Sequence, residues 1–153
     1  EAAGASGVVV AGPGADPFGW KALRGSMGSA LRLPIVTVPD VHTAIDEARR
    51  HDAQIVATVP RDGVSLFDAP LTGRVALLIG GEGAGLSPQA IGAADLSITI
   101  PMEPAVESLN AAVTAALIVY EARRQRTGRP EGRSTQKGSA APGRSAQKGS
   151  AAL

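Results

Sequence analysis

The sequence predicts an α/β fold in which a mostly parallel sheet has helices on both faces. Short apolar runs, such as residues 8–11 and 54–58, alternate with longer segments whose apolar residues recur at helical spacing. Short continuous apolar runs are typical of strands buried on both faces, and their alternation with helices is typical of a parallel sheet. Ligands bind beyond the carboxyl ends of such strands, so the loops after the strands are the candidate functional segments.

The first half of the chain holds the first expected strands. Residues 1–5 resemble the end of a helix that Gly4 closes. Asp40 is expected to cap one helix, and Trp20, at the start of another, is expected to be a packing residue. The expected elements of this half are strands over residues 8–11, 33–38 and 54–58 and helices over residues 20–28 and 40–51.

The second half continues the alternation after a turn-rich connection over residues 60–72. Further strands are expected over residues 74–79 and 96–100, a further helix over residues 87–93, and a final helix that follows the proline turn and ends at about residue 126. A glycine-rich loop follows the first of these strands, and a proline turn follows the second. We expect the two strands to be adjacent, so that their loops lie at one end of the sheet and enclose one small polar ligand.

Composition excludes several classes of site. The 153-residue chain has no cysteine, which excludes disulfides, thiolate catalysis and cysteine-based zinc sites. Its acidic residues and histidines lack the spacing of metal ligands. No apolar run approaches the roughly 20 residues of a membrane span, and no basic-apolar leader opens the chain. We therefore expect a single-domain cytoplasmic protein with no metal and no membrane partner.

The C-terminal residues differ in composition from the rest. Residues 1–120 contain seven Lys and Arg against twelve Asp and Glu, whereas residues 121–153 contain eight against two. Residues 133–141 recur in nearly the same form eleven residues later, and they lack the large apolar side chains that drive folding. We expect a domain over residues 1–126 and a disordered basic tail over residues 127–153. The tail either contacts RNA phosphates or only aids solubility.

Two segments carry the functional signal. Residues 80–85 read Gly-Gly-Glu-Gly-Ala-Gly, and residues 100–110 begin with Ile-Pro-Met and end with Ser-Leu-Asn. The first segment is neither a Walker loop nor a dinucleotide-binding loop, because its glycine spacing differs and no Gly-Lys-Ser/Thr follows. A purely structural turn is the alternative to a ligand site. The acid at Glu82 and the downstream Ser-Leu-Asn favour the ligand site.

Together, the two segments resemble the second and third motifs of the SpoU/TrmH family of RNA 2′-O-methyltransferases, in the SPOUT superfamily. The resemblance extends from residue 1 to about residue 126. It implies an α/β fold with a C-terminal trefoil knot that binds S-adenosylmethionine in a bent shape. It also implies methyl transfer to a ribose 2′-hydroxyl of ribosomal or transfer RNA. A non-catalytic, dimeric S-adenosylmethionine- or RNA-binding module of the same fold is the alternative.

The family's site residues carry over to the matching positions. The resemblance implies that Glu82, Ser108 and Asn110 serve the catalytic site. Arg24 and Ser26, in a segment that also resembles the family, either face RNA or form an ordinary helix end. In the family, the backbone of the knotted loops makes most of the cofactor contacts. The implied cofactor-binding residues are Thr58, Gly80, Gly81, Ile100, Met102 and Leu109.

One motif of the family has no counterpart in residues 1–153. The family's first motif places an Asn, a Gly and an Arg on a strand–helix unit ahead of the segment that matches residues 2–5. Two interpretations stay open: a chain that lacks an upstream segment, or a protein that binds without catalysing. We expect residues 1–153 alone to lack methyltransferase activity and a version extended upstream to have it.

The last predicted helix is apolar around most of its circumference. Such a helix must be buried on more than one side, and its small alanines permit close approach of a neighbour. The resemblance implies a homodimer through this helix, and a core helix within one chain is the alternative. The main apolar stripe comprises Val106, Leu109, Val113, Leu117 and Tyr120.

Overall fold

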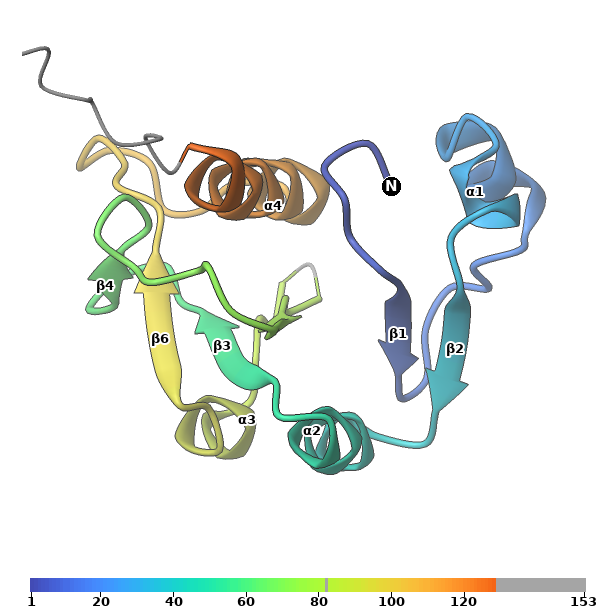
Figure 1. Ribbon diagram of the computed structural model, residues 1–153, viewed down its shortest axis with the longest axis horizontal. Helices are drawn as coiled ribbons and strands as arrows, with labels where there is room; N and C mark the ends of the chain where they lie inside the picture. Colours follow the sequence, from blue (N-terminus) through green and yellow to red (C-terminus); the bar gives the residue numbers. More distant parts are fainter. Residues whose placement is uncertain (82, 129–153) are drawn as a thin grey trace, which may run out of the picture.

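A computed structural model describes residues 1–81 and 83–128 of the chain and shows an α/β fold (Figure 1). The strands are β1 (Val8–Ala11), β2 (Ile35–Val38), β3 (Gln54–Thr58), β4 (Val64–Ser65), β5 (Val75–Leu78) and β6 (Leu96–Thr99). The helices are α1 (Trp20–Gly25), α2 (Val41–Arg50), α3 (Pro88–Gly92) and α4 (Ala111–Thr127), with a short 3₁₀ helix, η1 (Ser29–Leu31). Glu82 and the greater part of the predicted tail, residues 129–153, lie outside the described residues.

All pairs between these strands are parallel, as the apolar runs predicted. The strands divide into a two-stranded sheet, β1-β2, and a four-stranded sheet of order β4-β6-β3-β5. The central strand β3 is buried along Ile55, Val56 and Ala57. Because successive side chains of a strand point to opposite faces, β3 is covered on both. Figure 1 shows α4 on one side of this sheet and α2 and α3 on the other.

The main core lies between α4 and the four-stranded sheet. Val56 of β3 and Ile98 of β6 pack against Ile118 and Ala122 of α4. Burial of such side chains contributes about 1.5–3 kcal/mol each to folding. The rest of this cluster is Leu66, Ala69 and Leu71 from the connection after β4. That connection is therefore part of the core, although the sequence predicted only turns there.

Several expectations for the N-terminal half were correct and two were wrong. Asp40 caps α2 as predicted, since its Oδ1 accepts from the Thr43 N–H at 2.8 Å. Residues 1–5, however, form a turn closed by a bond of 2.8 Å from the Gly4 N–H to the Glu1 carbonyl, not a helix end. Trp20 is 64% exposed and is not a packing residue, because α1 buries none of its residues.

The expected single sheet with β5 beside β6 was also wrong. The structure places β3 between β5 and β6, with Ala57 opposite Leu78 on one side and Thr58 opposite Ile98 on the other. The most buried apolar run thus takes the central position, although it precedes both neighbours in the sequence. The loops after β5 and β6 still lie at one edge of the sheet, on either side of the end of β3.

A buried carboxylate fastens α4 to the connection after β4. Glu121, with 8% exposure, accepts from Arg124 Nε and Nη2 at 2.8 and 2.7 Å and from Gln125 Nε2 at 2.9 Å. Gln125 in turn accepts from the Leu71 N–H at 2.8 Å and donates to the Ala69 carbonyl at 2.9 Å. Hydrogen bonds from Arg124, and then from Gln125, lower the pKa of Glu121 from 4.5 to about 2.

Glu121→Gln is expected to lower the free energy of unfolding at neutral pH by about 1–2 kcal/mol, because charged hydrogen bonds in a partly exposed network are weakened. Because the pKa of Glu121 is lower in the folded than in the unfolded protein, its ionised carboxylate stabilises the folded state at pH values above the unfolded pKa. This stabilisation is lost as pH falls from about 4.5 towards 2. The difference between wild type and variant should therefore shrink over that range. Urea unfolding at a series of pH values measures it, with the exposed Glu47→Gln as control. A constant difference would show that the carboxylate charge is not the cause.

Candidate functional site

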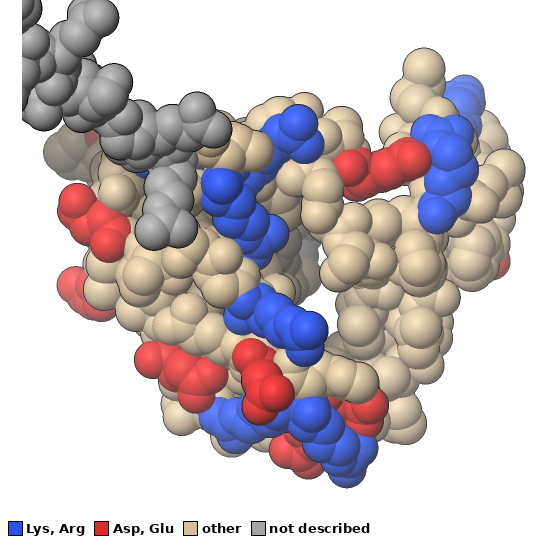
Figure 2. Space-filling view, in the orientation of Figure 1, with Lys and Arg blue, Asp and Glu red and all other residues tan. Residues whose placement is uncertain are grey.

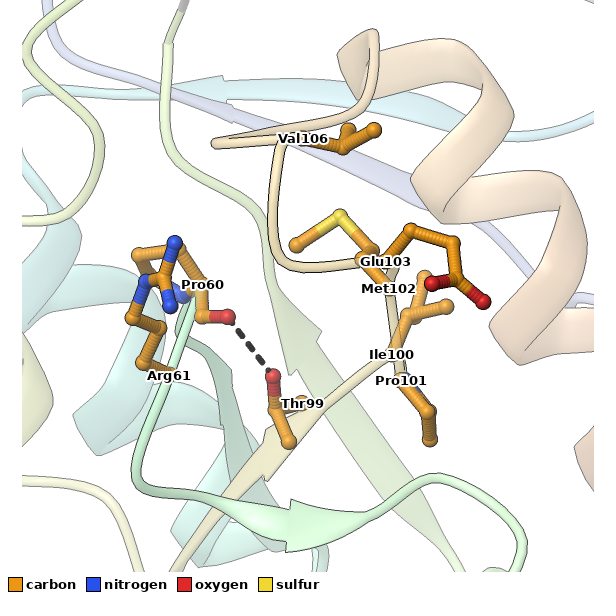
Figure 3. A pocket seen from close by; sticks show the side chains of 8 residues that line it. All are labelled: Pro60, Arg61, Thr99, Ile100, Pro101, Met102, Glu103 and Val106. Carbon is orange, nitrogen blue, oxygen red and sulfur yellow. Dashed lines mark hydrogen bonds between the residues drawn. The ribbon is translucent and has the colours of Figure 1, made fainter.

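A shallow pocket of about 200 Å³ lies beyond the carboxyl end of β6 (Figure 3). Two hydrogen bonds join residues 59–60 to the end of β6. The Thr99 hydroxyl donates to the Pro60 carbonyl at 2.9 Å, and the Val59 N–H donates to the Ile98 carbonyl at 2.9 Å. The segment after β3 is thereby fixed to the end of β6. The lining residues are Pro60, Arg61, Thr99, Ile100, Pro101, Met102, Glu103 and Val106.

Gly63 lets the turn after β3 approach this strand end. A Cβ atom at Gly63 would lie 2.7 Å from the Ile98 carbonyl carbon and 2.8 Å from the Thr99 nitrogen, both backbone atoms. No side chain fits at such distances, so only glycine lets the turn after β3 pack this closely against the end of β6, next to the pocket. No local sequence pattern marks Gly63, because its role depends on contacts with Ile98 and Thr99, which are distant in the sequence.

The glycine loop after β5 folds back on itself. The Gly85 N–H donates to the Gly81 carbonyl at 3.1 Å, and Gly81 and Gly85 form an isolated antiparallel bridge. A Cβ atom at Gly80 would lie 2.3 Å from the Gly85 carbonyl carbon, whereas one at Gly81 would meet nothing within 4 Å. Gly80 is therefore required by the loop itself, and the backbone of Gly81 is open to a ligand.

Thr58 lies between the two loops, at the end of β3. Its hydroxyl donates to the Leu78 carbonyl at 3.0 Å, which ties the end of β3 to the end of β5. Of the six predicted cofactor-binding residues, Ile100 and Met102 line the pocket, while Leu109 lies just before α4 and does not. Thr58 and the two loops thus share one edge of the sheet, as the sequence predicted, although not as neighbours in strand order.

Asn110 is the N-cap of α4. Its Oδ1 accepts from the Ala112 N–H at 2.9 Å and from the Val113 N–H at 3.4 Å. This contact fixes where the proline-turn loop ends and the helix begins. Ser108 lies in the same loop and is exposed, and neither residue lines the pocket. Glu82, the third predicted catalytic residue, lies outside the described residues.

The pocket has one basic and one acidic side chain that the sequence analysis missed. Arg61 and Glu103 lie on opposite sides of it in Figure 3. Both are exposed and stand at the start of loops that follow strands β3 and β6. Arg61 stands three residues after the predicted strand that ends at Thr58, and no motif marks it.

The two predicted RNA-binding residues lie elsewhere, at the end of α1. The Ser26 hydroxyl donates to the Leu23 carbonyl at 2.8 Å and so closes the helix. Arg24 is exposed, and its guanidinium lies 4.9 Å from the centre of the Trp20 ring. Ser26 therefore stabilises the end of α1, and Arg24 makes a cation–π contact with the exposed Trp20 ring.

Within residues 1–81 and 83–128, no group of three or more His, Cys, Asp and Glu side chains is placed to hold a metal ion. Over the same residues, no helix has both the length and the apolar character needed to cross a membrane.

The SpoU rRNA methylase family model matches residues 1–120. Among curated proteins, the chain is 42% identical over 131 residues to a 23S rRNA (uridine(2479)-2′-O)-methyltransferase of Streptomyces viridochromogenes, covering 82% of this chain and 46% of that protein. It is 33% identical over 123 residues to the 23S rRNA (guanosine(2553)-2′-O)-methyltransferase RlmP of Bacillus subtilis, covering 80% of this chain and 49% of that protein. The chain thus spans about half the length of these relatives.

Solved structures show the same similarity. The SpoU methyltransferase AviRb of Streptomyces viridochromogenes, in complex with the cofactor AdoMet, superposes with a TM-score of 0.75 at 42% identity, over 82% of this chain and 49% of that one. An AdoMet-bound rRNA methyltransferase of Sinorhizobium meliloti superposes with a TM-score of 0.76 at 34% identity, over 81% of this chain and 48% of that one.

Proposed function

We propose, since the chain belongs to the SpoU rRNA methylase family, that it is the catalytic domain of an RNA 2′-O-methyltransferase. The proposed reaction transfers the methyl group of S-adenosylmethionine to a ribose 2′-hydroxyl of ribosomal or transfer RNA. The observation that carries the proposal is the meeting of both motif loops at the end of β3, beside a pocket lined by Ile100 and Met102. The two AdoMet-bound relatives described above support it.

The pocket residues fit part of this cofactor. A volume of about 200 Å³ is below the roughly 300–1,000 Å³ of complete ligand sites, so a second surface is needed. The open backbone at Gly81 offers one, since nothing lies within 4 Å of its Cβ direction. We assign the pocket's apolar lining and peptide groups at Ile100 and Met102, with Gly80, Gly81, Thr58 and Leu109, to cofactor binding.

S-adenosylmethionine would supply a methyl group bonded to a positively charged sulfur. The ribose 2′-oxygen would bond to the methyl carbon as the carbon–sulfur bond breaks, releasing neutral S-adenosylhomocysteine, while a base accepts the hydroxyl proton. The chain's own residues position this reaction. Asn110 fixes the proline-turn loop by capping α4, and the exposed Ser108 is available to hold the ribose by a hydrogen bond. Glu82 is proposed as a third site residue on its place in the glycine motif alone.

The proposed domain covers residues 1–126, followed by a basic tail over residues 127–153. Helix α4 continues to Thr127, one residue beyond the predicted boundary. A C-terminal knot is part of the proposal, because the chain shares the fold of SpoU methyltransferases. The proposed location is the cytoplasm, where ribosomal and transfer RNA are found.

We further propose that two copies associate through α4. Val113, Leu117 and Tyr120 lie at helical spacing on this helix and are 48%, 44% and 53% exposed. Leu117 and Tyr120 also line a mostly apolar groove of about 280 Å³ with Phe67, which is 65% exposed. The core-facing side of α4 is a different one, at Ile118 and Ala122. A second copy would cover the outer stripe.

Methyl transfer from labelled S-adenosylmethionine to ribosomal and transfer RNA tests the function. The assay uses the product of the complete open reading frame that encodes residues 1–153, with the 153-residue chain beside it. Labelled nucleotides are expected to resist alkaline cleavage, since a methylated 2′-oxygen cannot attack the neighbouring phosphate. Label on a base would contradict the proposal. Cofactor binding without transfer by the complete product would favour the non-catalytic module.

A further inference from the structure

Helix α1 and the loop before it expose two aromatic rings, and two cations lie over one of them. Trp20 is 64% exposed and Phe18 is 50% exposed. Lys21 Nζ lies 5.9 Å and Arg24 Cζ lies 4.9 Å from the centre of the Trp20 ring. We call these four residues, Phe18, Trp20, Lys21 and Arg24, the aromatic-basic surface.

The chain holds this surface in place through its backbone. The Asp16 carboxylate accepts from the Phe18 N–H at 2.9 Å, and the Asp16 carbonyl accepts from the Gly19 N–H at 3.1 Å. The Gly19 carbonyl then accepts from the Leu23 N–H at 2.9 Å. The rings are therefore presented from an ordered turn, which lowers the entropy lost when a ligand stacks on them.

The charge of the surface indicates an anionic partner. Over the part of the chain that the structure describes, the salt bridges include neither Lys21 nor Arg24. Lys and Arg side chains gather over α1 and the segment after it in Figure 2, although residues 1–120 as a whole carry more acids than bases. Arg32, in the segment after α1, is paired with Glu1. Among the ion pairs and ring contacts of the described residues, however, Lys21 and Arg24 contact only the Trp20 ring, and two such cations complement a phosphate backbone.

The exposed Trp20 ring is suited to a nucleic acid with unpaired bases. Proteins bind single strands by stacking bases on aromatic side chains while cations follow the phosphates. Lys21 and Arg24 lie over the indole ring, and such cation–π contacts add to the binding of a base that stacks on the ring's free surface. An apolar protein partner fits less well, because Lys21 and Arg24 would be buried with the rings.

We propose that Trp20 stacks an unpaired base of the substrate RNA, and that Lys21 and Arg24 contact the flanking phosphates. The inference rests on the proposed function for the identity of the nucleic acid. In Figure 1, α1 and the loop between β6 and α4 lie at opposite sides of the molecule, with α4 between them. The surface therefore acts apart from the cofactor pocket, as a second point that holds the RNA.

Trp20 is the chain's one tryptophan, so its fluorescence reports directly on the surface. A single-stranded oligoribonucleotide is expected to quench the emission of the 153-residue chain, and a duplex RNA of the same composition much less. Trp20→Ala is expected to weaken single-strand binding roughly 5- to 150-fold, measured by anisotropy of labelled RNA. Trp20→Phe should retain most of the affinity, because a ring remains.

Three controls separate stacking from other effects. Leu31→Ala removes another exposed side chain, 78% exposed, and should leave RNA binding unchanged. The double variant Lys21→Gln, Arg24→Gln should weaken binding to single strands and duplexes alike and reduce the salt slope by about 0.7 per lost contact with a single strand. Calorimetry should show that Trp20→Ala binds S-adenosylmethionine as the wild type does.

Absence of quenching, with equal affinity of Trp20→Ala and wild type for single strands, would overturn the proposal. If Trp20→Ala lost affinity equally for single strands and duplexes, stacking of a base on Trp20 would be overturned. A change of oligomeric state in Trp20→Ala, without a change in RNA affinity, would assign the surface to a protein partner and overturn it too. Quenching by RNA in a chain that binds no S-adenosylmethionine would leave this proposal standing and contradict only the proposed function.

Discussion

Gly81→Val is expected to weaken S-adenosylmethionine binding about tenfold or more while the melting temperature stays near that of the wild type. Among the described residues other than its chain neighbours, nothing lies within 4 Å of a Cβ atom at Gly81, so the substitution should cause little strain within the chain. The new side chain would occupy the space in which a ligand approaches the loop backbone, and overpacking of that size costs about 1–3 kcal/mol. Isothermal titration calorimetry measures the affinity.

Two glycines provide matched comparisons. Gly73→Val adds the same side chain at another open position and should bind the cofactor normally. Gly80→Ala would place a methyl group 2.3 Å from the Gly85 carbonyl carbon, so it should disturb the loop itself and lower both stability and affinity. Unchanged affinity in Gly81→Val, in a folded protein, would remove the glycine loop from the site.

Leu117→Glu is expected to convert the proposed dimer into a monomer. The side chain lies at the middle of the exposed stripe of α4 and lines the groove with Phe67 and Tyr120. A symmetric interface would bury two new carboxylates, and each unpaired buried charge costs several kcal/mol. The dimer dissociation constant should rise at least about 100-fold, or roughly 3 kcal/mol. Light scattering after size-exclusion chromatography measures the mass.

Leu31→Glu is the control, because Leu31 is a leucine 78% exposed on η1, an element other than α4. It should leave the mass unchanged. A wild-type chain that is monomeric at high concentration would contradict the proposed association. A Leu117→Glu variant that stays dimeric would move the interface to another surface.

The sequence predicted most of the fold because its signals are local. Apolar runs located β1, β3, β5 and β6 to within two residues, and the cap at Asp40 located the start of α2. The strand β4 was missed, since Val64–Ser65 is only two residues long and pairs with β6 through backbone contacts. Strand order was also out of reach, because it depends on crossovers that no local pattern encodes.

For the candidate site, the glycine and proline motifs mark which loops to consider. Ile100 and Met102 were named in advance, and both line the pocket. Arg61 and Gly63 could not be named, because their roles arise when the turn after β3 meets the end of β6. The packing role predicted for Trp20 was wrong for a related reason: burial of its ring depends on tertiary neighbours, and the ring is 64% exposed on a helix that buries none of its residues.

The most direct test of the proposed site is the change in backbone amide NMR spectra of the isotope-labelled chain when S-adenosylmethionine is added. Cofactor contacts at the two loops should shift the amides of Gly80, Gly81, Met102 and Leu109 together with that of Thr58. The amides of α2, on the other face of the sheet, should move little. The result that supports the proposed site is a saturable change confined to the ends of β3, β5 and β6. Saturable changes centred elsewhere, or no change at millimolar cofactor in a folded chain, would contradict it.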